Sequence, residues 1–119
     1  MSDTGVIDRA ALKRLFEILG KDPQMLGEMM DEFFEDAPTF IARMRSALER
    51  GSAEELRIAA HSCKSNSASF GALALAEKCR AVEMLAKAGT FDGVAEGIAE
   101  IEQEYPRAKA ELESIRLAA

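Results

Sequence analysis

The sequence predicts an all-α protein, an antiparallel up-down-up-down four-helix bundle with a short additional N-terminal helix. Apolar residues recur at alternating steps of three and four along most of the chain, which is the spacing of one helix face. The 119 residues include 3 Pro, 8 Gly, no Trp and 1 Tyr, and no stretch alternates as a strand would. The links between the periodic segments are short, so neighbouring helices are expected to run antiparallel.

Length and composition predict one domain over residues 1–119. Hydrophobic residues make up 48% and charged residues 30%, which is typical of a folded, soluble protein. The net charge of −6 argues against a nucleic-acid partner, because no overall positive field is available for phosphate. We also find no apolar run of about 20 residues and no basic, apolar leader, so we expect no membrane association. With two cysteines and no disulfide pattern, we expect a cytoplasmic protein.

The first two helices are predicted from capping residues and apolar stripes. Asp8 is expected to start the short helix. Asp22 followed by Pro23 predicts the start of the second helix, and Gly51 its end. Pro38 falls inside this helix and is expected to kink or interrupt it. The two stripes consist of Leu12, Leu15 and Leu19, and of Leu26, Met30, Phe33, Ala37, Phe40, Met44 and Leu48.

Three further helices complete the bundle. Ser52 and Glu55 form a capping box for the third, Gly89 ends the fourth, and Thr90 is expected to cap the last. Their predicted inward residues are Leu56, Ala60, Cys63, Ser67 and Phe70; Leu75, Cys79, Val82 and Ala86; and Val94, Ile98, Ile101, Tyr105, Ala108, Leu112 and Ile115.

His61 is the single histidine of the chain, and its position on the third helix predicts that it faces solvent. At 100° per residue it lies about 140° from the centre of the apolar stripe. An exposed neutral imidazole is a free nucleophile. Lys64 lies one turn further on the same side and can place an ammonium beside an anion on the ring. From the residues alone, an ordinary solvated histidine remains open as the alternative.

The segment Ala60-His-Ser-Cys-Lys-Ser-Asn-Ser-Ala-Ser-Phe-Gly-Ala72 resembles the signature of the histidine-containing phosphotransfer (HPt) family. That signature has a histidine, a lysine three residues later, small polar residues and a Gly-Ala pair. Leu75, Cys79 and Glu83 match the downstream part of the family pattern, and the looser resemblance extends over most of the chain. One departure is Ser65, where many members of the family have glycine.

The resemblance implies a stand-alone phosphoryl carrier of a bacterial two-component phosphorelay. His61 would accept a phosphoryl group from a receiver-domain aspartyl phosphate of a hybrid histidine kinase and pass it to a response regulator. Lys64 would stabilise the charge of the phosphoryl group. We expect the chain to bind no cofactor, because it has no nucleotide loop for ATP and because the receiver partner would hold Mg²⁺. It would therefore be a carrier without enzyme activity of its own.

We expect a receiver to dock transiently on a monomer, over the helix that carries His61 and the helix that precedes it. Arg57, Ser65 and Ala68 are the predicted partner-binding residues, because small neighbours allow close approach and basic ones select partners. The main alternative is a helical adaptor that binds a receiver without being phosphorylated. A metal site of His61, Cys63 and Cys79, or a serine hydrolase, is a poorer interpretation, because the cysteines fall on apolar stripes and no strained nucleophile turn is present.

Overall fold

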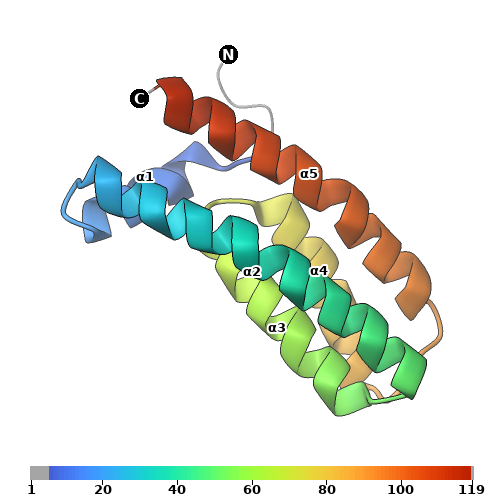
Figure 1. Ribbon diagram of the computed structural model, residues 1–119. Coiled ribbons are helices and arrows are strands. Elements are labelled where there is room, and N and C mark those ends of the chain that lie inside the picture. Colours follow the sequence, from blue (N-terminus) through green and yellow to red (C-terminus); the bar gives the residue numbers. More distant parts are fainter. Residues whose placement is uncertain (1–5, 119) are drawn as a thin grey trace.

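Four long helices run antiparallel in sequence order, and a short helix lies against one end of them (Figure 1). The computed structural model describes residues 6–118. Its helices are α1 (Arg9–Ile18), α2 (Pro23–Arg50), α3 (Ala53–Ser69), α4 (Leu73–Lys87) and α5 (Val94–Ala118). The predicted four-helix bundle with an N-terminal helix is therefore confirmed, and no strand occurs within the described range. No helix among these residues is both long and apolar enough to cross a bilayer.

Side-chain caps begin α1, α2 and α3, as the sequence predicts. Asp22 accepts hydrogen bonds from the backbone N–H groups of Gln24 and Met25 (3.0 and 3.2 Å). Ser52 accepts one from the N–H of Glu55 (3.3 Å), although the Glu55 carboxylate pairs with Arg50 instead of completing the capping box. Each capping oxygen satisfies backbone donors that the first turn of a helix leaves free.

Pro38 does not interrupt α2, which continues as one helix through Arg50. A proline lacks the N–H that would bond to the carbonyl four residues earlier, so the carbonyl of Phe34 loses its helical partner. The hydroxyl of Tyr105 on α5 donates a hydrogen bond to this oxygen at 3.4 Å. A tertiary contact thus compensates the loss, and such contacts lie beyond local sequence rules.

The start of the last helix also differs from the prediction. Thr90 accepts a hydrogen bond from the N–H of Asp92 (3.1 Å), but this bond forms only a turn, and α5 begins at Val94. Residues 90–93 are therefore a connection, with Gly93 at a φ of 80°. That left-handed conformation is strained for other residues and prevents a helix from starting at Thr90.

The core contains most residues of the predicted apolar stripes, with aromatic rings at one end. Five predicted residues are only partly buried and pack against the core, and they are Leu15, Leu26, Phe40, Leu48 and Ile115. Phe33 stacks on Phe70 with ring centroids 5.1 Å apart, and the Tyr105 ring meets its edge at 5.9 Å. The most extensive helix pair is α3 with α4. Both cysteines are free and buried in this pair, where they pack as small apolar residues. The small residues on both faces let these two helices lie close together, and they are Ala60, Cys63, Ser67, Ala72, Ala76 and Cys79.

Candidate functional site

His61 projects from the side of α3 that faces away from the core. The predicted inward stripe of this helix is fully buried, and it consists of Leu56, Ala60, Cys63, Ser67 and Phe70. The His61 side chain keeps 55% of its surface exposed. The geometric prediction of an accessible imidazole is therefore confirmed, and Cys63, two residues away, points into the core instead.

A buried carboxylate on α4 holds one nitrogen of this exposed ring. The side chain of Glu83 is only 2% exposed, and its Oε2 lies 2.9 Å from Nδ1 of His61. Glu83 is one turn beyond Cys79, on the side of α4 that packs against α3. Its length brings the carboxylate from this buried position to the edge of the site. The antiparallel pairing of α3 and α4 thus brings His61 and Glu83 together.

Two lysines, one on α3 and one on α4, compensate the negative charge of the buried Glu83 carboxylate. The ammonium of Lys64 on α3 lies 2.6 Å from Oε1 of Glu83, and that of Lys87 on α4 lies 3.7 Å from Oε2. Burial raises the pKa of the Glu83 carboxyl, but the opposing effects of Lys64 and His61 outweigh it and hold the pKa below its usual value. Glu83 is therefore ionised at neutral pH, and its buried charge is compensated.

The ionised carboxylate determines which imidazole nitrogen is free to react. A carboxylate only accepts hydrogen bonds, so we assign the proton of the neutral ring to Nδ1, which donates to Glu83. Nε2 then carries the lone pair. It makes no hydrogen bond or ion pair in the part of the chain that the structure describes. Chemically, the site is an oriented nitrogen nucleophile whose opposite nitrogen is tied to a negative charge.

Two of the predicted partner-binding residues, Ser65 and Ala68, lie on the side of His61 that faces α4, and the third, Arg57, lies one turn before His61. Ser65 and Ala68 are exposed and line an open hollow together with Ala76 and Arg80 of α4. Arg57 pairs with Glu54 at 2.7 Å, and this hydrogen bond raises its pKa. These small and paired side chains leave the ring uncovered.

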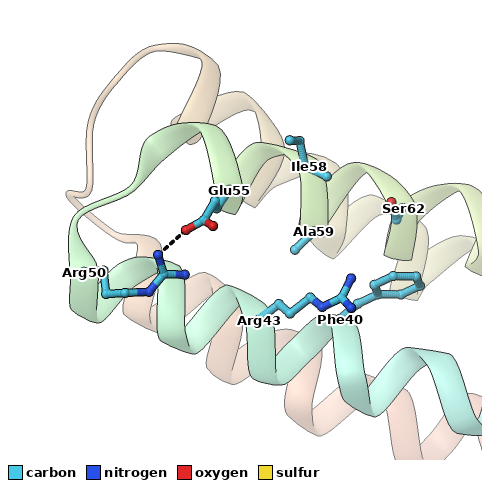
Figure 2. Close-up of a pocket in the computed structure, with 7 residues that line it drawn as sticks. All are labelled: Phe40, Arg43, Arg50, Glu55, Ile58, Ala59 and Ser62. Atoms are coloured by element: carbon cyan, nitrogen blue, oxygen red, sulfur yellow. Dashed lines mark ion pairs between the residues drawn. The ribbon is translucent and has the colours of Figure 1, made fainter.

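A second recess lies on the opposite side of His61, between α2 and α3. Figure 2 shows Phe40 and Arg43 of α2 facing Ala59 and Ser62 of α3 across this groove. Its volume is about 420 Å³. Ile58, half exposed, borders it next to the histidine turn, and the ion pair of Arg50 with Glu55 closes one end.

In the sequence, Glu83 matches the family pattern without an assigned role, and neither Lys87 nor Arg43 has one. A signal for Glu83 was present, because it follows Val82 and lies four residues after Cys79, which puts a charge at the edge of a buried stripe. Charges are seldom buried without partners, so this position pointed to an ion pair. Its partner depends on how α3 and α4 are aligned, which periodicity does not determine.

No group of three or more His, Cys, Asp or Glu side chains that could hold a metal ion occurs within residues 6–116, whose side chains the structure describes. Nδ1 of His61 is paired with the Glu83 carboxylate, and the thiol of Cys63 is buried in the core. The chemistry of these side chains is that of a nucleophile and its orienting carboxylate.

Comparison with known proteins agrees with this site. The Hpt domain model matches residues 28–111. The histidine-containing phosphotransfer protein HptB of Pseudomonas aeruginosa PAO1 has a similar structure, with a TM-score of 0.88, 26% identity, and coverage of 98% of this chain and 99% of HptB. The histidine-containing phosphotransfer protein ZmHP2 of maize shares the fold, with a TM-score of 0.80, 21% identity, and coverage of 98% and 92%. No curated protein sequence matches the chain significantly.

The family match includes the whole of α3 and α4, and thus both members of the His61–Glu83 pair. The fold match extends over nearly the entire chain. Proteins of this family are phosphoryl carriers in phosphorelays, where they work with receiver domains and response regulators. The chain belongs to the Hpt domain family of histidine phosphotransfer proteins.

Proposed function

We propose that His61 accepts a phosphoryl group from the aspartyl phosphate of a receiver domain in a hybrid histidine kinase and passes it to an aspartate of a response regulator. The observation that carries this proposal is the 2.9 Å contact between Nδ1 of His61 and the buried Glu83 carboxylate. It leaves Nε2 as the nucleophile on a side chain that is 55% exposed. A partner can therefore reach the ring while the ring keeps its orientation.

In the transfer step, the Nε2 lone pair of His61 attacks the phosphorus atom of the aspartyl phosphate. The N–P bond forms while the bond between phosphorus and the aspartate oxygen breaks, and the electron pair of that bond leaves with the carboxylate. The proton on Nδ1 stays in the hydrogen bond to Glu83. The ring becomes positively charged as the N–P bond forms, and the adjacent carboxylate stabilises that charge. Delivery to the next receiver reverses these steps.

The carrier contributes its nucleophile and cations, and the receiver contributes the other groups. Phosphoryl transfer through a loose transition state needs the leaving aspartate oxygen, the phosphorus and the attacking imidazole nitrogen to lie in one line. It also needs positive charge around the phosphoryl oxygens. We propose that Lys64 shares its charge between Glu83 and the phosphoryl group of the transfer complex. We also propose that the receiver supplies the Mg²⁺ ion, and that ATP is used by the kinase and not by this chain.

The small surface of α3 suits a flat, short-lived contact with the receiver. Ser65 and Ala68 are exposed one and two turns after His61, so the catalytic loops of a receiver can approach the ring without large side chains in the way. Arg57, one turn before it, is available at the edge of this contact and is held by Glu54.

The proposal is tested with the variant His61→Gln. Purified wild-type chain should become labelled by a phosphorylated receiver, and the label should be acid-labile, as a phosphoramidate is. His61→Gln should keep the helical circular dichroism of the wild type and accept no label, because its amide is not a nucleophile. A variant labelled at the wild-type rate would refute the proposal. Receivers that bind the wild type without ever phosphorylating it would indicate an adaptor instead.

A further inference from the structure

Cys63 and Cys79 are the two thiols of the chain, and the proposed transfer step uses neither of them. Both are completely buried, one on α3 and one on α4, in the most extensive helix pair of the bundle. The contact between His61 and Glu83 fixes how these helices are aligned, and Cys79 lies one turn before Glu83 on α4. This alignment brings Cys79 against the buried face of α3, where Cys63 lies two residues after His61.

The two thiols contact each other and differ in acidity. The thiol of Cys79 donates a hydrogen bond to the sulfur of Cys63. This bond, together with the Ser67 hydroxyl, outweighs the effect of burial and holds the pKa of Cys63 below its usual value. The same hydrogen bond and burial raise the pKa of Cys79. Cys63 is therefore the thiol that more readily becomes a thiolate, which is the reactive form.

We propose that Cys63 and Cys79 are a redox modification site, at which hydrogen peroxide forms a reversible disulfide between α3 and α4 that slows phosphoryl transfer. The formation of this bond is independent of the proposed function, whereas its effect on transfer rests on that function. The site is distinct from the transfer chemistry, because the thiols face the core and the imidazole faces solvent.

The effect on transfer follows from the place of the disulfide between the two helices. A disulfide holds its sulfur atoms about 2 Å apart, which is closer than a hydrogen bond holds them. The bond therefore draws α3 and α4 together next to the 2.9 Å contact between His61 and Glu83. Closely packed helices transmit such a shift, so the imidazole loses its alignment with the carboxylate.

The reaction uses peroxide as its oxidant. The Cys63 thiolate attacks one oxygen of the peroxide, the O–O bond breaks, and a sulfenic acid and hydroxide form. The Cys79 sulfur then attacks the sulfenic sulfur, the S–S bond forms, and the hydroxyl group leaves. The two thiol protons end in two water molecules, and the two electrons that the sulfurs lose reduce the peroxide. A dithiol such as dithiothreitol reverses the bond by thiol–disulfide exchange.

Peroxide reaches the sulfurs when α3 and α4 separate locally. Several side chains between these helices are small, so a local opening exposes little apolar surface. In addition, α4 begins at Leu73 without a side-chain cap, whereas α1, α2 and α3 each have one. Because the thiols react only in the opened state, we expect oxidation to take minutes to hours.

The test treats the reduced, purified chain with hydrogen peroxide, removes the peroxide with catalase, and counts free thiols after denaturation. The wild type should lose both thiols and the mass of two hydrogen atoms, and should run as a single chain on a non-reducing denaturing gel. Its rate of phosphoryl acceptance from a phosphorylated receiver should fall about fivefold or more, because a small misplacement of a reacting group is costly. Dithiothreitol should restore both the thiols and the rate.

Cys63→Ala and Cys79→Ala are the matched controls, because each keeps the six methionines that peroxide can also oxidise. Neither variant can form the bond within one chain, so peroxide should change their transfer rates by less than about twofold. Recovery of the wild type with dithiothreitol gives the same answer if a variant folds poorly, since dithiothreitol leaves methionine sulfoxide in place. Oxidation should slow Glu83→Ala less than the wild type, because that variant has already lost the contact.

Two results would overturn this proposal, and a third would refute the proposed function instead. Thiols that stay free after peroxide, or a disulfide that joins two chains, would show that the two cysteines are not such a site. A bond that forms within the chain and leaves the transfer rate within about twofold would remove its link to His61. A reduced chain that no phosphorylated receiver labels would refute the carrier function, while the thiol count would still decide whether the bond forms.

Discussion

The two sides of α3 next to His61 arrange their charges in opposite ways. Towards α4, a buried carboxylate is shared by the imidazole and two ammonium groups. Towards α2, the groove leaves the guanidinium of Arg43 without an acidic partner in the described residues. A balanced cluster holds its own side chains in place, whereas an unpaired charge gains most when a partner arrives. The comparison shows that compensated and uncompensated charges are separated onto the two sides of one helix.

The strongest way to break this separation is to remove the carboxylate of Glu83. Glu83→Ala should reduce the single-turnover rate of phosphoryl acceptance about 10- to 100-fold, because Nδ1 loses its orienting acceptor and the charged ring loses its stabilising partner. The rate is measured with a phosphorylated receiver at saturating concentration. Receiver affinity should change little, since Glu83 is buried and the exposed surface of α3 is unchanged.

Glu77→Ala is the control for this variant, because Glu77 is an exposed carboxylate on the same helix that pairs with Arg80. It should transfer phosphate at nearly the wild-type rate. Equal rates in Glu83→Ala and the wild type would mean that His61 is oriented by something other than α4.

The two lysines are expected to differ according to their contacts. Lys64 lies 2.6 Å from Glu83 and is 29% exposed, whereas Lys87 lies 3.7 Å away and is 52% exposed. Lys64→Ala should therefore slow transfer or shorten the lifetime of the phosphorylated form several-fold, and Lys87→Ala about twofold at most. Lys78→Ala serves as the control, because Lys78 is a lysine of α4 that pairs with Glu100 of α5. A larger effect at Lys87 than at Lys64 would reverse the proposed roles.

A smaller effect is expected in the pH dependence of stability. The folded-state pKa of Glu83 lies below its usual value of 4.5. Its contribution is therefore fully present above about pH 4.5 and is lost as the pH falls through the lower folded-state value. Between pH 6 and pH 3, the urea midpoint should fall less steeply in Glu83→Gln than in the wild type. Glu77→Gln should flatten the slope less, because its ion pair is exposed and screened. Parallel slopes in all three chains would contradict this account.

Much of the fold follows from local rules that the sequence displays. The stripes of α3 and α4 are buried as their spacing predicts, and the caps at Asp22 and Ser52 form. The exposure of His61 follows from the same helical geometry. The continuity of α2 through Pro38 does not, since it involves a hydroxyl from α5.

The electrostatics of the site could be predicted only in part. The helical spacing predicts Lys64 on the same side of α3 as His61, but the contact of Lys64 with Glu83 joins two helices. Likewise, the isolation of Arg43 depends on which acids the folded chain brings near, and Glu55 pairs with Arg50 instead. Such pairings are set by the alignment of packed helices, and a periodic pattern on each helix leaves that alignment open.

The turn between α3 and α4 has a consequence for the start of the chain. Gly71 adopts a φ of 78°, and its carbonyl accepts a hydrogen bond from the N–H of Asp8 at 2.6 Å. A side chain at this position would collide with the Asp8 carbonyl, so both the conformation and the contact require glycine. The segment before α1 is therefore hydrogen-bonded to the turn between α3 and α4, the two helices that carry His61 and Glu83. A substitution at Gly71 that breaks this contact should lower the rate of phosphoryl transfer, although every residue around the imidazole is unchanged.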